Sequence, residues 1–444
     1  MDTSNKQGSG KFSSKWGFVL ACVGSAVGMA NVWGFPYRLG SYGGGAFLVA
    51  YIFFIVLFSY VGLSAEYAIG RRAKTGTVGA YANAWASGGK SKLLGDNVGW
   101  LPLIGSMCIA IGYAVIVAYA LKAAAQSFSG SLMTINTNTW FDSFALTDFS
   151  VIPFHLIVVV GTLATLLLGA DSIEKTNKVM MPLFFILFLI LAIRVAFLPG
   201  AAEGYKFMFT PRWDALKDPV TWVWAMAQAF FSLSVTGSGM IVYGAYLSDD
   251  EDVIDGAKWT GIFDFIAAIT AALVIIPACF AYGFDVGAGP GLLYVTLPYI
   301  LQNMPLGRVF AMILFTAVVF AGVSSLQNMF EVVGESLLYK FPKLKRAPML
   351  VILGVVCFGI GVFMEPISKW GPWMDFVSIY IQPIGATLGA LSWFWIMKKD
   401  DLMNEINLGS KIKHGDTWYN VGRYLYVPLA LLLSIYALVF KVAF

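Results

Sequence analysis

The chain alternates between long apolar runs and short polar connections. A helix needs about 20 consecutive, mostly apolar residues to cross the hydrocarbon core of a bilayer. Transmembrane β-barrels show short segments of alternating polarity, whereas these runs are long and unbroken. The pattern therefore predicts an all-α polytopic membrane protein. Its eleven transmembrane helices are expected at residues 16–40, 45–70, 95–128, 152–169, 176–198, 220–246, 257–283, 306–338, 347–364, 373–397 and 421–442.

The distribution of lysine and arginine predicts the orientation of these spans. Twenty of the 29 basic residues fall in the N-terminal segment and in the loops on its side of the membrane, which indicates the cytoplasm. Eleven spans then place the C-terminus outside. The predicted organisation is a cytoplasmic tail (1–15), a first five-helix repeat (16–198), a second five-helix repeat (199–397), a cytoplasmic loop (398–420) and an eleventh helix with an external C-terminus (421–444).

Three shorter segments refine this organisation. Residues 1–15 are polar, and no short apolar segment with a cleavage site follows, so a retained tail is expected rather than a signal peptide. Residues 129–151 contain no lysine or arginine, as suits an external loop. Residues 284–305 are partly apolar and contain glycine and proline. This last segment fits a loop that dips into an external vestibule, and it fits an interfacial loop equally well.

Composition narrows the function. Of the 444 residues, 58% are hydrophobic and 12% are charged, which is about half the charged share of a soluble domain. A soluble enzyme, a disordered protein and a secreted disulfide scaffold are excluded. The four cysteines lie far apart in apolar runs, which favours helix packing over metal or disulfide chemistry. We expect no enzyme activity, because no nucleophile–base pair or nucleotide-binding loop is recognisable, and no nucleic acid or obligate protein partner.

Spans one and six carry small and polar residues at their centres, over Gly24–Asn31 and Phe231–Gly239. Each glycine inside a helix costs about 1 kcal/mol relative to alanine, and unwound backbone survives in a membrane only where it lines a cavity. Packing of small residues would explain either segment alone. The two spans occupy equivalent places in the two predicted halves, however, and paired interruptions of this kind point to a transporter binding site at the midplane.

Ionisable residues inside spans mark further candidates. Asp264 lies in an otherwise apolar run and is either a functional carboxylate or a partnered structural one. Glu66 is expected to accept N–H groups of unwound backbone. Ser324 and Ser325 are adjacent hydroxyls in span eight, although helical serines often bond back to their own helix. Pro182 predicts either a plain kink or a weak inner segment of span five that unwinds.

Three segments resemble the neurotransmitter:sodium symporter family. Span one reads GSAVGMANVWGFP at 24–36 followed by GGGAF at 43–47, span six reads QAFFSLS at 228–234, and span eight reads FAGVSS at 320–325. The similarity extends over spans one to ten and is greatest to bacterial members that carry hydrophobic amino acids. It implies a leucine-transporter-type fold in the bacterial cytoplasmic membrane: a 5+5 inverted repeat, with helices 1 and 6 unwound at the midplane, plus one extra helix.

The resemblance also implies two sodium sites. Sodium is a hard cation and binds several oxygen ligands, as other hard cations do. The first site would use Ala26, Asn31, Ser232 and Asp264 together with the substrate carboxylate. The second would use the carbonyls of Gly24, Val27 and Ala321 with the hydroxyls of Ser324 and Ser325.

The implied substrate site is Ala26, Gly28, Ile109, Tyr113, Phe231, Ser232, Ser234, Gly237 and Met329. In that resemblance Tyr113 bonds the substrate carboxylate and Phe231 forms a lid. Gly28 stands where monoamine transporters carry an aspartate, which implies an amino acid substrate. Gly237 stands where relatives with a tight pocket carry phenylalanine. We therefore expect large hydrophobic substrates such as tryptophan, phenylalanine, tyrosine or leucine.

Departures from the family pattern concern chloride and the gates. Asp264 falls where chloride-dependent relatives have asparagine, and Ala268 lacks the hydroxyl that chloride would need, so no chloride is expected. Gly34 replaces the arginine of the usual outer gate, whose partner would be Asp375, and Arg38 is the nearest alternative cation. Glu66, Trp33, Asp375 and Pro182 are the expected supporting and gating residues.

These observations predict a sodium-coupled symporter that imports hydrophobic or aromatic L-amino acids by alternating access. Its only other partner would be the lipid bilayer. One alternative is a proton-coupled or exchange-type transporter of the same fold, which Asn31 and the Ser324–Ser325 pair disfavour. The other is an amino acid sensor that does not transport, for which a long soluble signalling domain would be expected.

Overall fold

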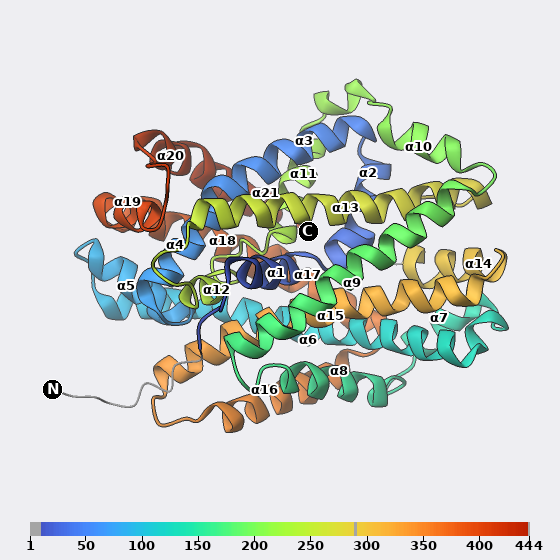
Figure 1. The fold of residues 1–444 in the computed structure, drawn as a ribbon, viewed down its shortest axis with the longest axis horizontal. Helices are drawn as coiled ribbons and strands as arrows, with labels where there is room; N and C mark the ends of the chain where they lie inside the picture. Colours follow the sequence, from blue (N-terminus) through green and yellow to red (C-terminus); the bar gives the residue numbers. More distant parts are fainter. Residues whose placement is uncertain (1–9, 288–290, 443–444) are drawn as a thin grey trace.

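The computed structural model describes residues 10–287 and 291–442. The predicted tail (1–15) and the predicted loop (284–305) therefore lie partly outside the described residues. Within the described ranges the regular structure is helical, and the one β-bridge joins Gly44 to Pro211 without forming a strand. Many of the long helices run roughly along the longest axis of the molecule (Figure 1).

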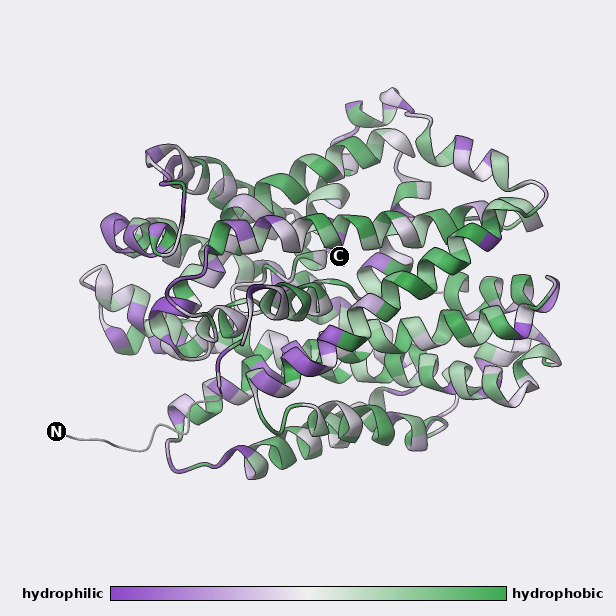
Figure 2. Ribbon diagram, in the orientation of Figure 1, coloured by the Kyte–Doolittle hydropathy of each residue, from purple (hydrophilic) through white to green (hydrophobic). Residues whose placement is uncertain are grey.

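Among the described residues, seven helices are long and apolar enough to cross a membrane, or eight if one bent pair counts as a single span. Hydrophobic residues predominate along these helices (Figure 2). The seven are α3–η2–α4 (Gly45–Ala73), α6 (Lys92–Ser129), α9 (Ala170–Ala196), α13 (Val253–Tyr282), α15 (Gly307–Lys340), α16–η6 (Arg346–Met364) and α20–η9–α21 (Asp416–Phe440). The bent pair is α1 (Lys15–Ala26) with η1 (Ala30–Gly34) and α2 (Phe35–Ser41).

The other predicted spans are shorter, interrupted or less apolar, so the count of eleven stays a prediction. They correspond to α8 (Ile152–Ala164), to α11 (Pro219–Ser232) with α12 (Ile241–Ala245), and to α17 (Ile367–Phe376), η7 (Val377–Ile381), α18 (Gln382–Leu391) and η8 (Ser392–Ile396). The division into two repeats likewise stays a prediction.

Both predicted interruptions are present. Helix α1 ends at Ala26, Val27 is extended, and the chain resumes as a helix after a bend of 58°. Helix α11 ends at Ser232 and α12 begins at Ile241. Between them Ser234 and Gly237 have φ values of 55° and 74°. Left-handed backbone is rare for a residue other than glycine, so the α-helix cannot continue through Ser234.

Several helices occur where the sequence pattern indicates loops. They are α5 (Thr77–Ser87), α7 (Thr137–Ala145), α10 (Ala201–Phe209), α14 (Leu297–Gln302) after η5 (Leu292–Thr296), and α19 (Lys399–Asn407), with short 3₁₀ turns η3 (Ser131–Met133) and η4 (Trp213–Lys217). Helices α5 and α19 lie at one end of the molecule, and α7 and α14 lie at the other (Figure 1). The expected external loop over residues 129–151 contains helix α7, which buries Trp140 and Phe144, and its external position stays a prediction.

Close helix contacts hold the interrupted spans in place. Helix α12 packs on α4 (Ser64–Ala73), and α1 packs between α9, α13 and α15. The first contact depends on glycine, because a Cβ on Gly70 would lie 1.9 Å from the carbonyl oxygen of Ile241. The two breaks therefore lie among closely packed helices.

Candidate functional site

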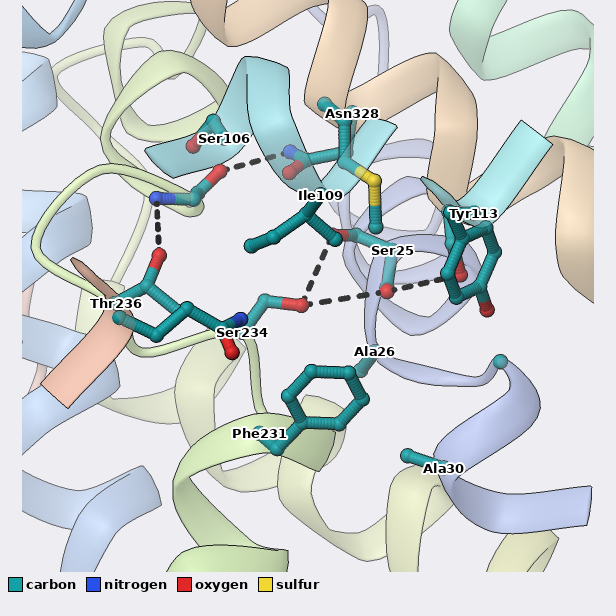
Figure 3. A pocket seen from close by; sticks show the side chains of 15 residues that line it. Ser25, Ala26, Ala30, Ser106, Ile109, Tyr113, Phe231, Ser234, Thr236 and Asn328 are labelled. Atoms are coloured by element: carbon teal, nitrogen blue, oxygen red, sulfur yellow. Dashed lines mark hydrogen bonds between the residues drawn. The ribbon is translucent and has the colours of Figure 1, made fainter. Parts of the chain in front are cut away.

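A cavity of about 40 Å³ lies between the two breaks, and helices α6 and α15 form its other walls. Figure 3 shows side chains from these elements converging on it. Its lining consists of Ser25, Ala26, Gly28, Ala30, Ser106, Ile109, Tyr113, Phe231, Ser234, Thr236, Gly239, Ser325, Asn328, Met329 and Gln382. Of the nine predicted substrate residues, seven line this cavity: Ala26, Gly28, Ile109, Tyr113, Phe231, Ser234 and Met329.

The remaining two predicted residues lie elsewhere. Ser232 is fully buried beside Asp264. Gly237 does not line the cavity, because a Cβ there would lie 2.2 Å from the carbonyl oxygen of Gly385 and 2.8 Å from the hydroxyl of Tyr81. The absence of a side chain at Gly237 therefore does not enlarge this cavity, and the expectation of a vacated ring volume at that position needs correction.

Tyr113 and the break in span one define one end of the cavity. The Tyr113 hydroxyl accepts the Met29 amide at 2.8 Å and retains its own proton to donate. A Cβ on Gly28 would lie 2.3 Å from the Tyr113 Oη and 2.7 Å from the Ser325 Oγ. Only glycine therefore fits at position 28 without moving both hydroxyls.

Three of the four residues of the expected first sodium site form one buried network, and the fourth, Ala26, lines the cavity. Asn31, Ser232 and Asp264 are each fully buried. Asn31 Nδ2 donates to Asp264 Oδ1 at 2.7 Å and to Ser232 Oγ at 3.0 Å, and Ser232 donates to the same carboxylate oxygen at 2.6 Å. The Tyr51 hydroxyl donates to Asp264 Oδ2 at 3.4 Å. In the described part of the chain these partners are all neutral, so the network suits a cation.

The residues of the expected second sodium site also meet. Ser325 Oγ lies 3.4 Å from the carbonyl oxygens of Gly24 and Val27 and 3.3 Å from that of Ser25. One hydroxyl proton satisfies only one of three carbonyls. Ser324 is beside them but bonds back to the carbonyl of Ala321 at 3.0 Å. Converging oxygen atoms with spare lone pairs fit a hard cation.

Glu66 stabilises the break in span six. Its two carboxylate oxygens accept the amides of Gly237 at 2.8 Å and Met240 at 2.9 Å. These amides have no helical partner where the helix is unwound, and leaving them unsatisfied in a buried position would cost about 1–3 kcal/mol each. Glu66 therefore has a structural position at the break and is not part of the cavity lining.

A second, larger cavity of about 210 Å³ lies on the other side of Phe231, and Trp33, Arg38 and Asp375 are among its lining residues. Ala30, Tyr113 and Phe231 line both cavities and so lie between them. Arg38 Nη1 donates to Gln228 Oε1 at 2.5 Å, and its guanidinium lies 4.8 Å from the Trp224 ring centre. Arg38 is thus held by an amide and an aromatic ring, and no ion pair with Asp375 is among the contacts of the described residues.

Pro182 lies within an uninterrupted α9, so the inner segment of this helix is folded in this conformation. Sequence reasoning missed Ser106, Thr236 and Asn328, which all line the main cavity. Ser106 was recognisable in principle, since it lies three and seven residues before Ile109 and Tyr113 and so shares their helix face.

Comparison with known proteins identifies the family of this chain. The profile of the sodium:neurotransmitter symporter family matches residues 9–151 and 146–443. The chain belongs to this family. Members of this family are sodium-dependent transporters, so the chain is a sodium-dependent transporter and not an enzyme. Its apolar helices and its bacterial homologues identify it as a multi-pass protein of the cytoplasmic membrane.

Individual relatives cover almost the whole chain. The sodium-dependent transporter YhdH of Bacillus subtilis is 30% identical over 95% of this chain and 96% of its own length. A sodium-dependent transporter of Haemophilus influenzae is 26% identical over 97% of this chain and 98% of its own length. The crystal structure of MhsT in complex with L-phenylalanine has a TM-score of 0.85 and 30% identity, with 96% of this chain and 99% of that chain covered. The fold of the described residues is therefore that of MhsT.

Proposed function

We propose that this symporter imports hydrophobic and aromatic L-amino acids by alternating access, with two sodium ions bound beside the substrate. The observation that carries the proposal is the cavity at two helix breaks, with a tyrosine hydroxyl at one end and two buried oxygen clusters beside it. Interrupted spans in corresponding positions place transporter binding sites at the midplane. The complex of MhsT with L-phenylalanine supports the same substrate class.

The amino acid head group would bind at the Tyr113 end. The Tyr113 proton is available to a carboxylate oxygen, and glycine at position 28 allows the Tyr113 hydroxyl to lie close to the unwound backbone. A carboxylate is charged, so this hydrogen bond contributes about 1.5–3 kcal/mol. Ile109 and Met329 then offer apolar surface to the side chain, and Phe231 closes the cavity toward the larger one.

The two oxygen clusters would hold the sodium ions. The first comprises Asn31, Ser232 and Asp264 with the carbonyl of Ala26, and rotation of the Asn31 amide would turn its oxygen toward the cluster. The second comprises Ser324, Ser325 and the carbonyls of Gly24, Val27 and Ala321. A bound sodium ion would neutralise the buried charge of Asp264, which has only neutral partners among the described residues.

Chloride would not be required. Asp264 already supplies a fixed negative charge within the first cluster, and Ala268, one helical turn away, offers no hydroxyl to an anion. A second buried negative charge at this place would be repelled by the first.

The conformational cycle would move the residues around Phe231. A cavity of about 40 Å³ holds roughly three waters, so an aromatic side chain enters only when the cavity widens. The segment between Ser232 and Ile241 forms one wall and is not held in a continuous α-helix. We place the N-terminus in the cytoplasm and the C-terminus outside, and we retain eleven spans with a 5+5 inverted repeat.

Uptake of labelled L-tryptophan into proteoliposomes tests the proposal. An inward sodium gradient in gluconate buffer should drive accumulation, whereas a matched potassium gradient should not. Binding without accumulation would favour a sensor, accumulation driven by a proton gradient would favour the proton-coupled alternative, and loss of uptake in gluconate that chloride restores would refute chloride independence.

A further inference from the structure

The end of the cavity opposite Tyr113 is polar, although the proposed substrates are hydrophobic. Tyr113, Ile109 and Ser106 lie on one face of α6, with seven residues, or about 10 Å of helix rise, between the first and the last. They present a hydroxyl, an apolar chain and a second hydroxyl in that order. Figure 3 shows Ser106, Thr236 and Asn328 together at this end.

The hydrogen bonds behind this polar end orient its hydroxyl protons. Ser238 is fully buried behind the cavity wall, and its Oγ lies 3.3 Å from the carbonyl oxygen of Pro102. A carbonyl can only accept, so the arrangement that satisfies all three contacts of Ser238 places its single proton on the Pro102 carbonyl. In that arrangement the Ser106 hydroxyl, at 2.8 Å, and the Thr236 hydroxyl, at 3.2 Å, donate to Ser238.

Ser106 and Thr236 therefore turn oxygen lone pairs, and no protons, toward the cavity. Thr236 Oγ1 accepts a hydrogen bond from the Gly239 amide at 3.3 Å, which leaves it one free lone pair. Among the described residues, Ser106 Oγ accepts no hydrogen bond in this arrangement, so both of its lone pairs stay free. A bound apolar side chain would displace water from these oxygens without replacing its hydrogen bonds. A side chain with a terminal N–H or O–H donor would restore them.

We infer that this polar end is a subsite that selects aromatic amino acids with a terminal hydrogen-bond donor, the indole of tryptophan or the phenol of tyrosine, over phenylalanine and leucine. The inference rests on the proposed function, because it assumes that the amino acid head group binds at Tyr113. Sites built to hydrogen-bond a substrate group reject analogues that lack it far more strongly than apolar pockets reject a missing methylene.

Competition binding on the purified full-length protein in saturating sodium tests the subsite. Labelled L-tryptophan is displaced with L-tryptophan, L-tyrosine, L-phenylalanine and β-(3-benzothienyl)-L-alanine, in which sulfur replaces the indole N–H at nearly unchanged shape. We expect the affinity for tryptophan to be at least about tenfold higher than that for the benzothienyl analogue. The affinity for tyrosine should exceed that for phenylalanine by a similar factor.

Two variants locate the effect. In Ser106→Ala and in Thr236→Val, the affinity ratio of tryptophan to its benzothienyl analogue and that of tyrosine to phenylalanine should each fall to about threefold or less. The affinity for phenylalanine should stay nearly unchanged. Ser127→Ala is the matched control, since Ser127 is a buried serine on the same helix whose hydroxyl bonds only the carbonyl of Ala123. It should keep the wild-type ratios.

Equal affinities for tryptophan and its benzothienyl analogue in the wild type would overturn the inference without any variant. Equal losses for tryptophan and phenylalanine in the variants would also overturn it. Sodium-dependent binding of none of the four compounds would contradict the proposed function itself, and the subsite with it.

Discussion

Replacement of Gly28 by alanine places a methyl group at the Tyr113 end of the proposed site. A Cβ there lies 2.3 Å from the Tyr113 Oη and 2.7 Å from the Ser325 Oγ. Ordinary contact begins near 3.4 Å, so the tyrosine hydroxyl must retreat by about 1 Å. That movement lengthens its 2.8 Å hydrogen bond from the Met29 amide and misplaces the proton offered to a substrate carboxylate.

The cost follows from these two hydrogen bonds. Loss of the proton donated to a charged carboxylate costs about 1.5–3 kcal/mol of substrate binding, whereas the Met29 contact is lost in the free and the bound protein alike. At 1.4 kcal/mol for each tenfold change, the affinity for L-tryptophan should fall by roughly 10- to 150-fold. The fold should survive, because the displaced atoms are the ends of two side chains.

Equilibrium binding of labelled L-tryptophan in saturating sodium measures this loss. Gly359→Ala is the matched control, since Gly359 lies within α16 and a Cβ there meets no atom within 4 Å. Its affinity should match the wild type. A Gly28→Ala protein that binds tryptophan within a factor of three of the wild type would refute the assignment of the head group to this end of the cavity.

Three further predictions concern the ions and the frame. Asp264→Asn should raise the sodium concentration for half-maximal tryptophan binding by about tenfold or more, in a sodium titration, because the buried charge is lost. Ser325→Ala should also weaken sodium activation but leave the ratio of tryptophan to phenylalanine affinity unchanged. Arg71→Ala should cost about 3–5 kcal/mol of stability in thermal unfolding, because buried Arg71 bonds Glu405 at 2.6 Å, whereas Lys74→Ala at an exposed ion pair should cost about 1 kcal/mol or less.

The sequence predicted both helix breaks because their cause is local. Clustered glycine and hydroxyl residues weaken a helix wherever they occur, and the breaks appear after Ala26 and Ser232 as the motifs indicate. The pairing of Asn31 with Asp264 was reached through family resemblance, since these residues are 233 positions apart and no local pattern joins them.

Other features depend on packing that the sequence pattern does not encode. The motif position predicts Gly237 at the cavity wall. In the structure its backbone has a φ of 74°, and a Cβ on this residue would point at the carbonyl of Gly385 and not into the cavity. The meeting of Ser106 with Ser238 requires α6 to pack against the unwound segment. Helix α7 was missed because tertiary burial of Trp140 stabilises a segment that is polar in composition.

The ratio of sodium to tryptophan entering proteoliposomes tests the central claim most directly. Uptake of ²²Na⁺ and labelled L-tryptophan is measured in parallel at an imposed membrane potential, with empty liposomes as the background. Two ions for each zwitterion would add about 4.6 kcal/mol per 100 mV to the driving force, so tryptophan accumulation should rise steeply with the potential. A ratio near two sodium ions for each tryptophan supports the proposal that both oxygen clusters bind sodium during the transport of one substrate. Tryptophan accumulation without sodium entry would contradict the account.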